Sequence, residues 1–514
     1  MLAKTFGSTV YGVDASIITV EVNVNQSTGF YMVGLPDNAI KESEQRVESA
    51  IKYLGYARPR NKTIVNLAPA NMKKEGSAYD LPIALCILHA SGQIFAGALE
   101  NYVILGELSL DGKLRPINGA LPIAIEARKN NFKGFILPAE NANEAAIVDG
   151  LDVIGVETLQ DAIDFMEGHM EIKPLVKDTR DIFYYDQEQI DVDFSDVQGQ
   201  EDVKRSLEVA AAGGHNVLMV GPPGSGKTML ARRLGTILPP MSLHEALETT
   251  KIHSVAGKLD TNAALIARRP FCSPHHTSSD VALVGGGNIP QPGQISLSHN
   301  GILFLDELPE FKRTVLEVLR QPLEERLVTI SRAKATVEFP ANFMLVASMN
   351  PSPSGDFYTA DGTHPDSPAA VQRYLSKVSG PLLDRIDLHI EVNPVSFDQM
   401  TADKKTESSK SIRERVIKAR ERQSERFKEW DINIHNNAMM APQQVKKVCQ
   451  INQAGKTLLK TAMERLNLSS RAYDRILKVS RTIADLADSD DIKVEHLAEA
   501  IQYRSLDREG WGTV

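Results

Sequence analysis

The fold of this 514-residue chain is decided by one stretch, Gly221-Pro222-Pro223-Gly224-Ser225-Gly226-Lys227-Thr228. It matches the phosphate-loop pattern G-x-x-x-x-G-K-[ST] at every fixed position. The apolar run before it predicts a buried strand, and the residues after it predict the start of a helix. In that setting the loop N–H groups and the helix N-terminus bind phosphate oxygens. We therefore expect ATP here, with Lys227 on the β- and γ-phosphates and the Thr228 hydroxyl on Mg²⁺.

A second motif supplies the acidic groups that the first lacks. The apolar run 302–305 predicts a strand buried on both faces. Asp306 and Glu307 follow at its C-terminal end, where open α/β sheets bind ligands. We expect Asp306 to hold Mg²⁺ together with Thr228, and Glu307 to polarise the attacking water. An Asp-Glu pair alone often just ends a strand, but beside a phosphate loop it predicts ATP hydrolysis.

Two further polar residues fit an oligomeric ATPase. Asn350 follows another apolar run, and we expect it to orient the water near the γ-phosphate. The alternative is an ordinary turn asparagine. Arg385 precedes a short apolar run, and we expect it to stabilise charge on the phosphoryl group bound by a neighbouring subunit. The alternative is a surface pair between Arg385 and either Asp384 or Asp387.

Composition and charge set the broad class. The net charge of −9 argues against a general nucleic-acid binder of the histone type, but it allows local basic loops. The three cysteines lack C-x-x-C spacing, which suits a reducing cytosol. No run approaches the roughly 20 apolar residues needed to span a membrane. We therefore expect a cytoplasmic protein of about two to four domains that is not membrane-bound.

The N-terminal third predicts a separate α/β domain. Strand composition at 17–24 and 62–67 flanks a helical spacing over 39–54. Residues 106–113 and 135–138 resemble the proteolytic domain of Lon proteases. That resemblance raises the question of peptidase activity.

The residues needed for a Lon-type Ser–Lys dyad are missing. In such a dyad a lysine activates the serine. Here the nucleophile position falls on Ala78, and Ser77 lies one residue early. Leu121 takes the place of the lysine. We therefore expect no proteolysis, and we expect the domain to serve assembly, DNA contact or docking of a partner that the sequence does not identify.

The order of the nucleotide motifs resembles that of AAA+ ATPases. An inserted segment at 271–294 and a hairpin at 327–339 resemble the magnesium-chelatase-like branch. With the Lon-like N-terminal part, the chain resembles the ComM/YifB competence family over essentially its full length. This resemblance implies a bacterial homo-oligomer, a hexameric ring that binds ATP and Mg²⁺.

The hairpin matters for the substrate. Arg332 and Lys334 lie at its tip, and in related rings such hairpins point into the central pore. Cations there would contact DNA phosphates without reading sequence. The alternative is a solvated turn, because cations are common at hairpin tips.

The inserted segment also carries Cys272, His275 and His276, which offer three metal ligands and no evident fourth. We expect hydrogen-bonding roles for them rather than a structural zinc site.

The C-terminal part predicts a helical lid. Residues 468–475 resemble the second sensor motif of AAA+ proteins, which implies that Arg471 touches a γ-phosphate of its own or a neighbouring subunit. The alternative is a surface arginine paired with Asp474. Residues 404–430 are highly charged with a thin apolar stripe, and we predict a solvent-bridging helix rather than a core element.

These observations predict an α/β protein of four parts. They are a Lon-protease-like domain without proteolytic activity (1–170), a polar linker (171–193), an AAA+ core with a parallel sheet (194–400), and a charged helix followed by the helical lid (401–514).

The family resemblance implies an ATP hydrolase that is a DNA helicase. Its partner would be single-stranded or branched DNA, and it would drive branch migration and strand integration in natural transformation and homologous recombination. One alternative is a chelatase-type AAA+ motor subunit that acts on a protein partner, against which the Lon-like domain counts. Another is a non-enzymatic or proteolytic adaptor, against which the intact ATPase motifs and the missing dyad count.

Overall fold

The computed structural model divides the chain into two compact units, each described by itself. The N-terminal unit consists of Met1–Asp186, Ser242–Ala267 and Pro290–Pro292. The second unit, here called the ATPase unit for the phosphate-loop motif that it contains, consists of Gln187–Met241, Arg268–Ile289 and Gly293–Val514. The described residues are 1–25, 28–57, 62–74, 76–177, 183, 192–260, 264–287, 290–332, 335–355, 366–396, 406–428, 430, 434–466 and 468–504. Among these residues, no helix is long and apolar enough to cross a membrane.

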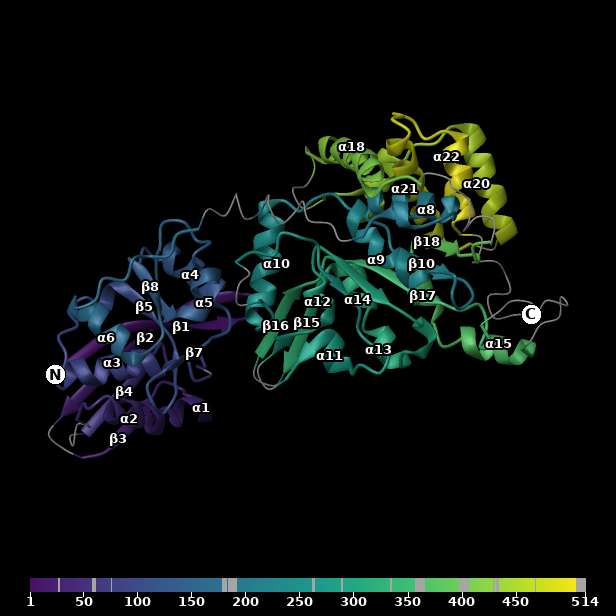
Figure 1. The fold of residues 1–514 in the computed structure, drawn as a ribbon. Helices are drawn as coiled ribbons and strands as arrows, with labels where there is room; N and C mark the ends of the chain where they lie inside the picture. The colour runs from purple at the N-terminus through teal and green to yellow at the C-terminus, as the bar shows by residue number, and fades with distance from the viewer. Residues whose placement is uncertain are drawn as a thin grey trace. The chain divides into compact units, whose positions relative to one another are not determined.

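The N-terminal unit is built on a seven-stranded mixed sheet with the strand order β3-β4-β2-β1-β5-β8-β9 (Figure 1). The strands are β1 (Leu2–Tyr11), β2 (Asp14–Asn25), β3 (Phe30–Val33), β4 (Lys62–Ala68), β5 (Tyr102–Ile104), β8 (Gly134–Pro138) and β9 (Asp152–Val156). A separate hairpin pairs β6 (Glu107–Leu108) with β7 (Leu114–Arg115). In β2, the alternating apolar residues Ile18, Val20 and Val22 are fully buried, as period-two patterning requires.

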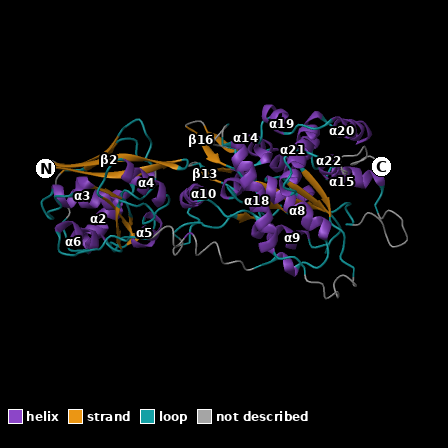
Figure 2. Ribbon diagram, turned by 90° about the horizontal axis from the view of Figure 1, so that it is seen from above, coloured by secondary structure: helices purple, strands orange, loops and turns teal. Residues whose placement is uncertain are grey.

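Helices cover this sheet. They are α1 (Asn38–Lys41), α2 (Ser43–Tyr53), α3 (Asp80–Ala90), α4 (Ala120–Lys129), α5 (Ala139–Ala145), α6 (Leu159–Glu167) and α10 (Leu243–Val255). Figure 2 shows α2 and α3 on one side of strand β2. Helix α3 is almost entirely apolar and buried, so it forms the centre of the core of this unit.

The ATPase unit contains a five-stranded parallel sheet with the order β11-β14-β17-β10-β18. Its strands are β10 (Val217–Val220), β11 (Phe271–Cys272), β14 (Ile302–Leu305), β17 (Met344–Met349) and β18 (Leu388–Glu391). Every residue of β10, β14 and β17 is buried, which explains their continuous apolar runs. Helices α8 (Glu201–Gly213) and α9 (Lys227–Ile237) pack beside the sheet.

Shorter elements complete the two units. The predicted hairpin forms from β15 (Leu327–Arg332) and β16 (Ala335–Pro340). The others are α11 (Asp280–Val284), β12 (Gly285–Gly286), β13 (Gln291–Pro292), α12 (Gln294–Leu297), α13 (Arg313–Glu317), α14 (Arg320–Glu325), α15 (Pro368–Leu375), α16 (Gly380–Leu383) and 3-10 turns at Leu99–Asn101, Phe194–Asp196, Leu308–Glu310 and Asn437–Met439.

The C-terminal part is helical, as predicted. Its helices are α18 (Ser409–Phe427), α19 (Pro442–Val448), α20 (Gln453–Leu466), α21 (Ser470–Leu486) and α22 (Val494–Gln502). They share one hydrophobic core with the sheet and with α8 and α9, to which α18 contributes Val416 and α21 contributes Ile483. Lid and sheet therefore belong to a single packed body.

The prediction that α18 is a solvent-bridging helix is wrong. Its thin stripe, including Ile412 and Phe427, is buried in that shared core. Two of its polar residues also face inward: the Arg420 guanidinium donates to Ala211 O (2.9 Å) and the Gln423 amide to Ala212 O (3.1 Å). A narrow stripe is sufficient because α18 packs on the C-terminal carbonyls of α8, which its polar side chains satisfy.

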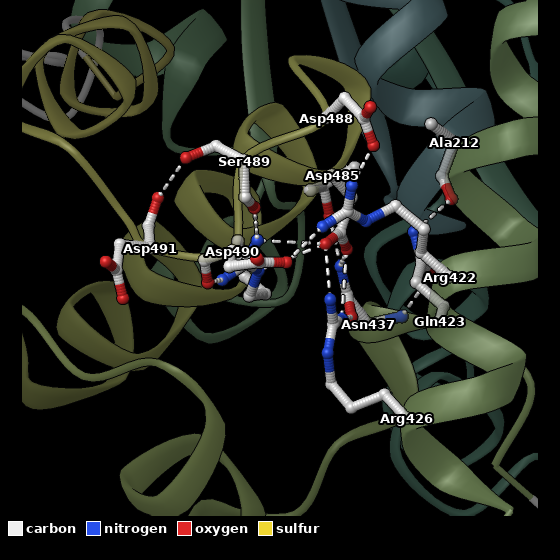
Figure 3. Close-up of polar contacts among 12 residues, drawn as sticks. Ala212, Arg422, Gln423, Arg426, Asn437, Asp485, Asp488, Ser489, Asp490 and Asp491 are labelled. Atoms are coloured by element: carbon white, nitrogen blue, oxygen red, sulfur yellow. Dashed lines mark hydrogen bonds and ion pairs between the residues drawn. The ribbon is translucent and has the colours of Figure 1, made fainter.

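A buried carboxylate fixes the lid helices together. Asp485 of α21 accepts hydrogen bonds from Arg426 (3.0 Å) and Asn437 (2.8 Å) (Figure 3). It also accepts a hydrogen bond from Arg481 (3.1 Å). Its side chain has no exposed surface. A buried charge is tolerated only when it is paired and hydrogen-bonded, so this network defines how the lid helices pack on one another.

Candidate nucleotide site

The phosphate loop connects β10 to α9 with the backbone geometry that its glycines permit. Gly224 and Gly226 adopt φ values of 77° and 89°, in the left-handed region that favours glycine. A Cβ on Gly221 would come within 2.2 Å of the Val392 carbonyl oxygen. Glycine is therefore required at these positions for the loop to curl in front of the N-terminus of α9.

Lys227 lies at the centre of the loop. Its ammonium donates to Gly221 O (2.6 Å), Pro222 O (2.8 Å) and Asn350 Oδ1 (3.2 Å). Burial lowers the pKa of Lys227, and the nearby Asp306 and Glu307 carboxylates oppose that shift. Lys227 is 8% exposed and the hydrogen-bond acceptors of its ammonium are neutral oxygens, so the site fits an anion such as a phosphate group. The structure thus brings together Lys227 and Asn350, as the sequence predicted.

Asp306 is surrounded by hydroxyl groups. Thr228 Oγ1 donates to Asp306 Oδ2 (2.9 Å), and Ser348 Oγ donates to Asp306 Oδ1. This cluster of hard oxygen donors suits Mg²⁺, which takes carboxylate and hydroxyl oxygens. The sequence did not point to Ser348. The available signal was a small polar residue within an apolar strand whose parallel neighbour, β14, ends at Asp306.

Glu307 lies near a histidine from the inserted segment. His276 Nδ1 lies 3.6 Å from Glu307 Oε2. His276 follows β11, which pairs with β14, so the sheet register brings the two side chains to the same edge. Glu307 itself has φ 53°, an unusual value for a residue other than glycine. The hydrogen-bonding role that we expected is seen for the neighbouring His275, whose Nδ1 accepts the Thr277 N–H (3.3 Å).

Arg385 has a different partner from those that the sequence suggested. It is 4% exposed, lies 2.6 Å from Glu324 and donates to Pro381 O (2.5 Å). Its partner is therefore on α14, and the alternatives Asp384 and Asp387 are wrong. Sequence adjacency misled because the Arg385 side chain pairs with a helix that is distant in the sequence.

Arg471 also has a different partner from the one in the alternative interpretation. Its side chain is 55% exposed, and its guanidinium lies 4.0 Å from Asp384 rather than beside Asp474. Arg471 stands at the first turn of α21, so its side chain reaches back to the segment that carries Arg385. The structure groups Lys227, Thr228, Asp306 and Asn350, and it gives Arg385 and Arg471 partners outside that group.

The two predicted DNA contacts cannot be placed. The hairpin pairs β15 with β16 from Leu327 opposite Pro340 to Arg332 opposite Ala335. Lys334 and the Arg332 side chain lie outside the described residues.

In the N-terminal unit, the positions of a Lon-type dyad hold other contacts. Ser77 Oγ donates to the Glu107 carboxylate, and the backbone N–H of Leu121 donates to Glu144 (2.8 Å). Lys74 is buried and donates to the carbonyls of Gly34 and Pro69. Ser77 is thus paired with a carboxylate, and the lysine of a Lon-type dyad is absent from its position.

Family models match three parts of the chain. "Magnesium chelatase, subunit ChlI" matches residues 193–400, "Subunit ChlI of Mg-chelatase" residues 20–141, and "Magnesium chelatase, subunit ChlI C-terminal" residues 406–504. Competence protein ComM of Haemophilus influenzae is 44% identical over 511 residues, which cover 99% of this chain and 98% of that protein. The chain belongs to the ComM/YifB family. Its magnesium-chelatase-like AAA+ core, predicted from the motifs, is thereby confirmed.

Two further relatives support the family and its N-terminal part. YifB of Salmonella typhimurium is 45% identical over 503 residues, 97% of this chain and 96% of that protein. Lon protease 2 of Bacillus subtilis is 28% identical over 186 residues, 31% of this chain and 33% of its own. The Lon-like character of the N-terminus in this ComM/YifB protein is therefore confirmed, together with the predicted α/β fold class.

Proposed function

We propose that this ComM/YifB protein is a Mg²⁺-dependent ATPase that works as a DNA motor. The observation that carries the ATPase proposal is the convergence of Lys227, Thr228, Asp306 and Asn350 on one edge of the parallel sheet. Polar groups at the carboxyl ends of such strands form the ligand site of open α/β folds. Membership of a magnesium-chelatase-like AAA+ family supports the same activity.

Each residue of the site has a proposed role. The loop 221–228 binds the phosphates, and Lys227 exchanges its neutral partners for β- and γ-phosphate oxygens. Thr228 and Asp306 hold Mg²⁺, which neutralises charge on the phosphates when bound. Glu307 accepts a proton from the attacking water, and Asn350 orients that water.

The ring and its shared sites are part of the proposal. We propose a homo-oligomer, a hexamer, in which Arg385 and Arg471 act on phosphoryl charge at subunit boundaries. Arg385 is buried against the half-exposed Glu324. In a ring it would have to exchange Glu324 for a phosphate, or it would affect the phosphate only by positioning the segment that carries it. Arg471 is already exposed and lies beside that segment.

The DNA activity rests on the relative named a competence protein and on the hairpin 327–340. We propose helicase and branch-migration activity on single-stranded or branched DNA, with Arg332 and Lys334 as phosphate contacts. The proposed domains are a Lon-like domain without proteolytic activity (1–170), a linker (171–193), the AAA+ core (194–400) and the charged helix with the lid (401–514). The pairing of Ser77 with Glu107 supports the inactivity.

A second candidate is a chelatase-type motor acting on a protein partner. The family models named for a magnesium chelatase subunit favour it. The experiment that separates the two follows strand displacement on a branched DNA by the purified full chain with ATP and Mg²⁺. Displacement that is lost in Lys227→Ala supports the DNA motor. ATP turnover without displacement or stimulation on any DNA tested would contradict it and favour the protein-remodelling motor.

A further inference from the structure

One segment between two ATPase elements folds as part of the N-terminal unit. Residues 242–267, here called the coupling arm, follow helix α9 of the phosphate loop and precede β11 of the parallel sheet. They nevertheless belong to the compact N-terminal unit. Helix α10, which forms half of the arm, packs on α4 of that unit.

The contact between the arm and the N-terminal unit is specific and buried. The Gly119 N–H, at the start of α4, donates to Ser254 O (3.1 Å). The Ser254 hydroxyl donates to the Glu144 carboxylate, which also accepts the Leu121 N–H (2.8 Å). Ser254 and Glu144 are both buried, and burial raises the pKa of Glu144 against these hydrogen bonds. Buried polar groups that hydrogen-bond to one another hold the elements that carry them in a single arrangement.

The arm is also closely fitted where it leaves α10. A Cβ on Gly257 would come within 2.7 Å of Asn118 Oδ1, and Gly257 has φ 61°. The segment that returns from the helix is tied to it, because the Ile266 N–H donates to Thr250 Oγ1 (3.0 Å). The arm therefore moves with α4 and α5 as one body.

The residues that flank the arm in the chain are tied to one another within the ATPase unit. Arg269 Nε donates to Pro239 O (2.7 Å), and its NH1 group donates to Asn300 O (2.7 Å). Pro239 and Pro240 lie between α9 and the arm, and proline fixes φ. Asn300 lies just before β14, the strand that ends at Asp306. Arg269, just after the arm, thus bonds both to Pro239, just before the arm, and to Asn300, just before the strand of the acidic motif.

We propose that the coupling arm transmits the nucleotide state of the ATPase unit to the N-terminal unit. Helix α9 begins at Lys227, so a ligand that displaces the phosphate loop also displaces this helix. The C-terminal end of the helix continues through the two prolines into the arm, so the displacement can reach the arm. The N-terminal domain, for which we propose no proteolytic activity, would then change in response to nucleotide binding. The inference rests only on the nucleotide-binding part of the proposed function.

The test is hydrogen exchange of the full-length protein with and without ATPγS and Mg²⁺. We expect nucleotide to change amide exchange in residues 117–125 and 246–256 by about fivefold or more, the lower end of ordinary coupling between sites. Arg269→Met, and separately Pro239→Gly with Pro240→Gly, should remove that change while leaving protection of the phosphate loop by nucleotide intact. Ser254→Ala should weaken it, whereas Ser43→Ala, a buried serine bonded to Ile40 O away from the arm, should not.

Two results would overturn the inference. One is nucleotide protection of the phosphate loop in the wild type with no change in 117–125 or 246–256. The other is a change in those residues that persists at full size in both the Arg269 and the proline variants. Absence of protection at the phosphate loop itself would instead refute the proposed nucleotide site. Neither hydrolysis nor DNA is needed for the measurement.

Discussion

Asp387→Asn should destabilise the ATPase unit more than any ordinary surface substitution. Asp387 is 2% exposed and joins three parts of that unit. Its carboxylate contacts Arg475 of the lid helix α21, accepts the Asn216 N–H (2.9 Å) at the start of β10, and lies 3.6 Å from His215 Nδ1. It also sits in the segment that carries Arg385, so its loss affects the sheet, the lid and the proposed subunit contact together.

The magnitude follows from burial. Removing one partner of a buried ion pair costs about 3 to 5 kcal/mol, because the other charge is left unpaired. Asparagine keeps the shape and one acceptor oxygen, and the Arg475 side chain retains 21% exposure, so we expect the lower end, about 3 kcal/mol. For a body of this size that corresponds to a fall in Tm of about 6 °C.

The pH dependence has a definite sign. Burial alone would raise the pKa of Asp387, but Arg475, His215 and the Asn216 N–H together hold it below its usual range. A carboxylate with a lowered folded-state pKa stabilises fully above its ordinary pKa and loses that contribution as the pH falls through the folded value. The difference between wild type and Asp387→Asn should therefore stay constant from about pH 8 to about pH 5 and shrink only below about pH 4.

The assay is thermal unfolding of both proteins followed by near-ultraviolet circular dichroism. Asp474→Asn, a partly exposed carboxylate on the same lid helix, is the matched control and should change Tm by less than about 2 °C. A fall of less than about 2 °C in Asp387→Asn, or a difference that disappears near neutral pH, would refute this reasoning.

Three further predictions concern the nucleotide site. Glu307→Gln should bind ATP with ordinary affinity but hydrolyse it at least about 100-fold more slowly, measured by single-turnover kinetics; equal turnover would exclude Glu307 as the base. Ser348→Ala should raise the Mg²⁺ concentration for half-maximal hydrolysis about tenfold, because Asp306 loses the hydroxyl that orients it; an unchanged Mg²⁺ titration would contradict this. Arg385→Ala should hydrolyse poorly, yet mixing it with Lys227→Ala subunits should restore turnover if Arg385 acts across a boundary; no recovery would confine Arg385 to its pairing with Glu324 within one subunit.

The parts of the site that the sequence could predict are encoded locally. A phosphate loop requires consecutive glycines before a helix, and a strand buried on both faces requires a continuous apolar run, so Lys227, Thr228 and Asp306 were recognisable from short stretches. Asn350 followed from the same logic, since it ends a neighbouring strand.

The contacts that the sequence could not predict depend on register and packing. Ser348 reaches Asp306 because β17 and β14 are parallel neighbours, and His276 reaches Glu307 because β11 lies beside β14. Arg385 pairs with Glu324, far away in sequence, which no local pattern indicates.

One larger error has the same origin, as does one arrangement that no motif indicated. Charge density suggested that α18 is exposed, although its narrow stripe and its bonds to α8 bury it. Segment 242–267 lies between ATPase motifs in the chain but packs with the Lon-like unit. The predicted domain boundaries stay a prediction.

The most direct test of the ATPase proposal is the rate of Mg²⁺-dependent ATP hydrolysis by the purified full chain, compared with Lys227→Ala. Lys227 carries the buried ammonium whose partners are neutral oxygens, so its loss should abolish phosphate binding. We predict turnover in the wild type that requires Mg²⁺ and falls at least about 100-fold in Lys227→Ala. Hydrolysis that persists at the wild-type rate in Lys227→Ala, or that is absent from the wild type under every condition that supports ATP binding, would contradict the proposal.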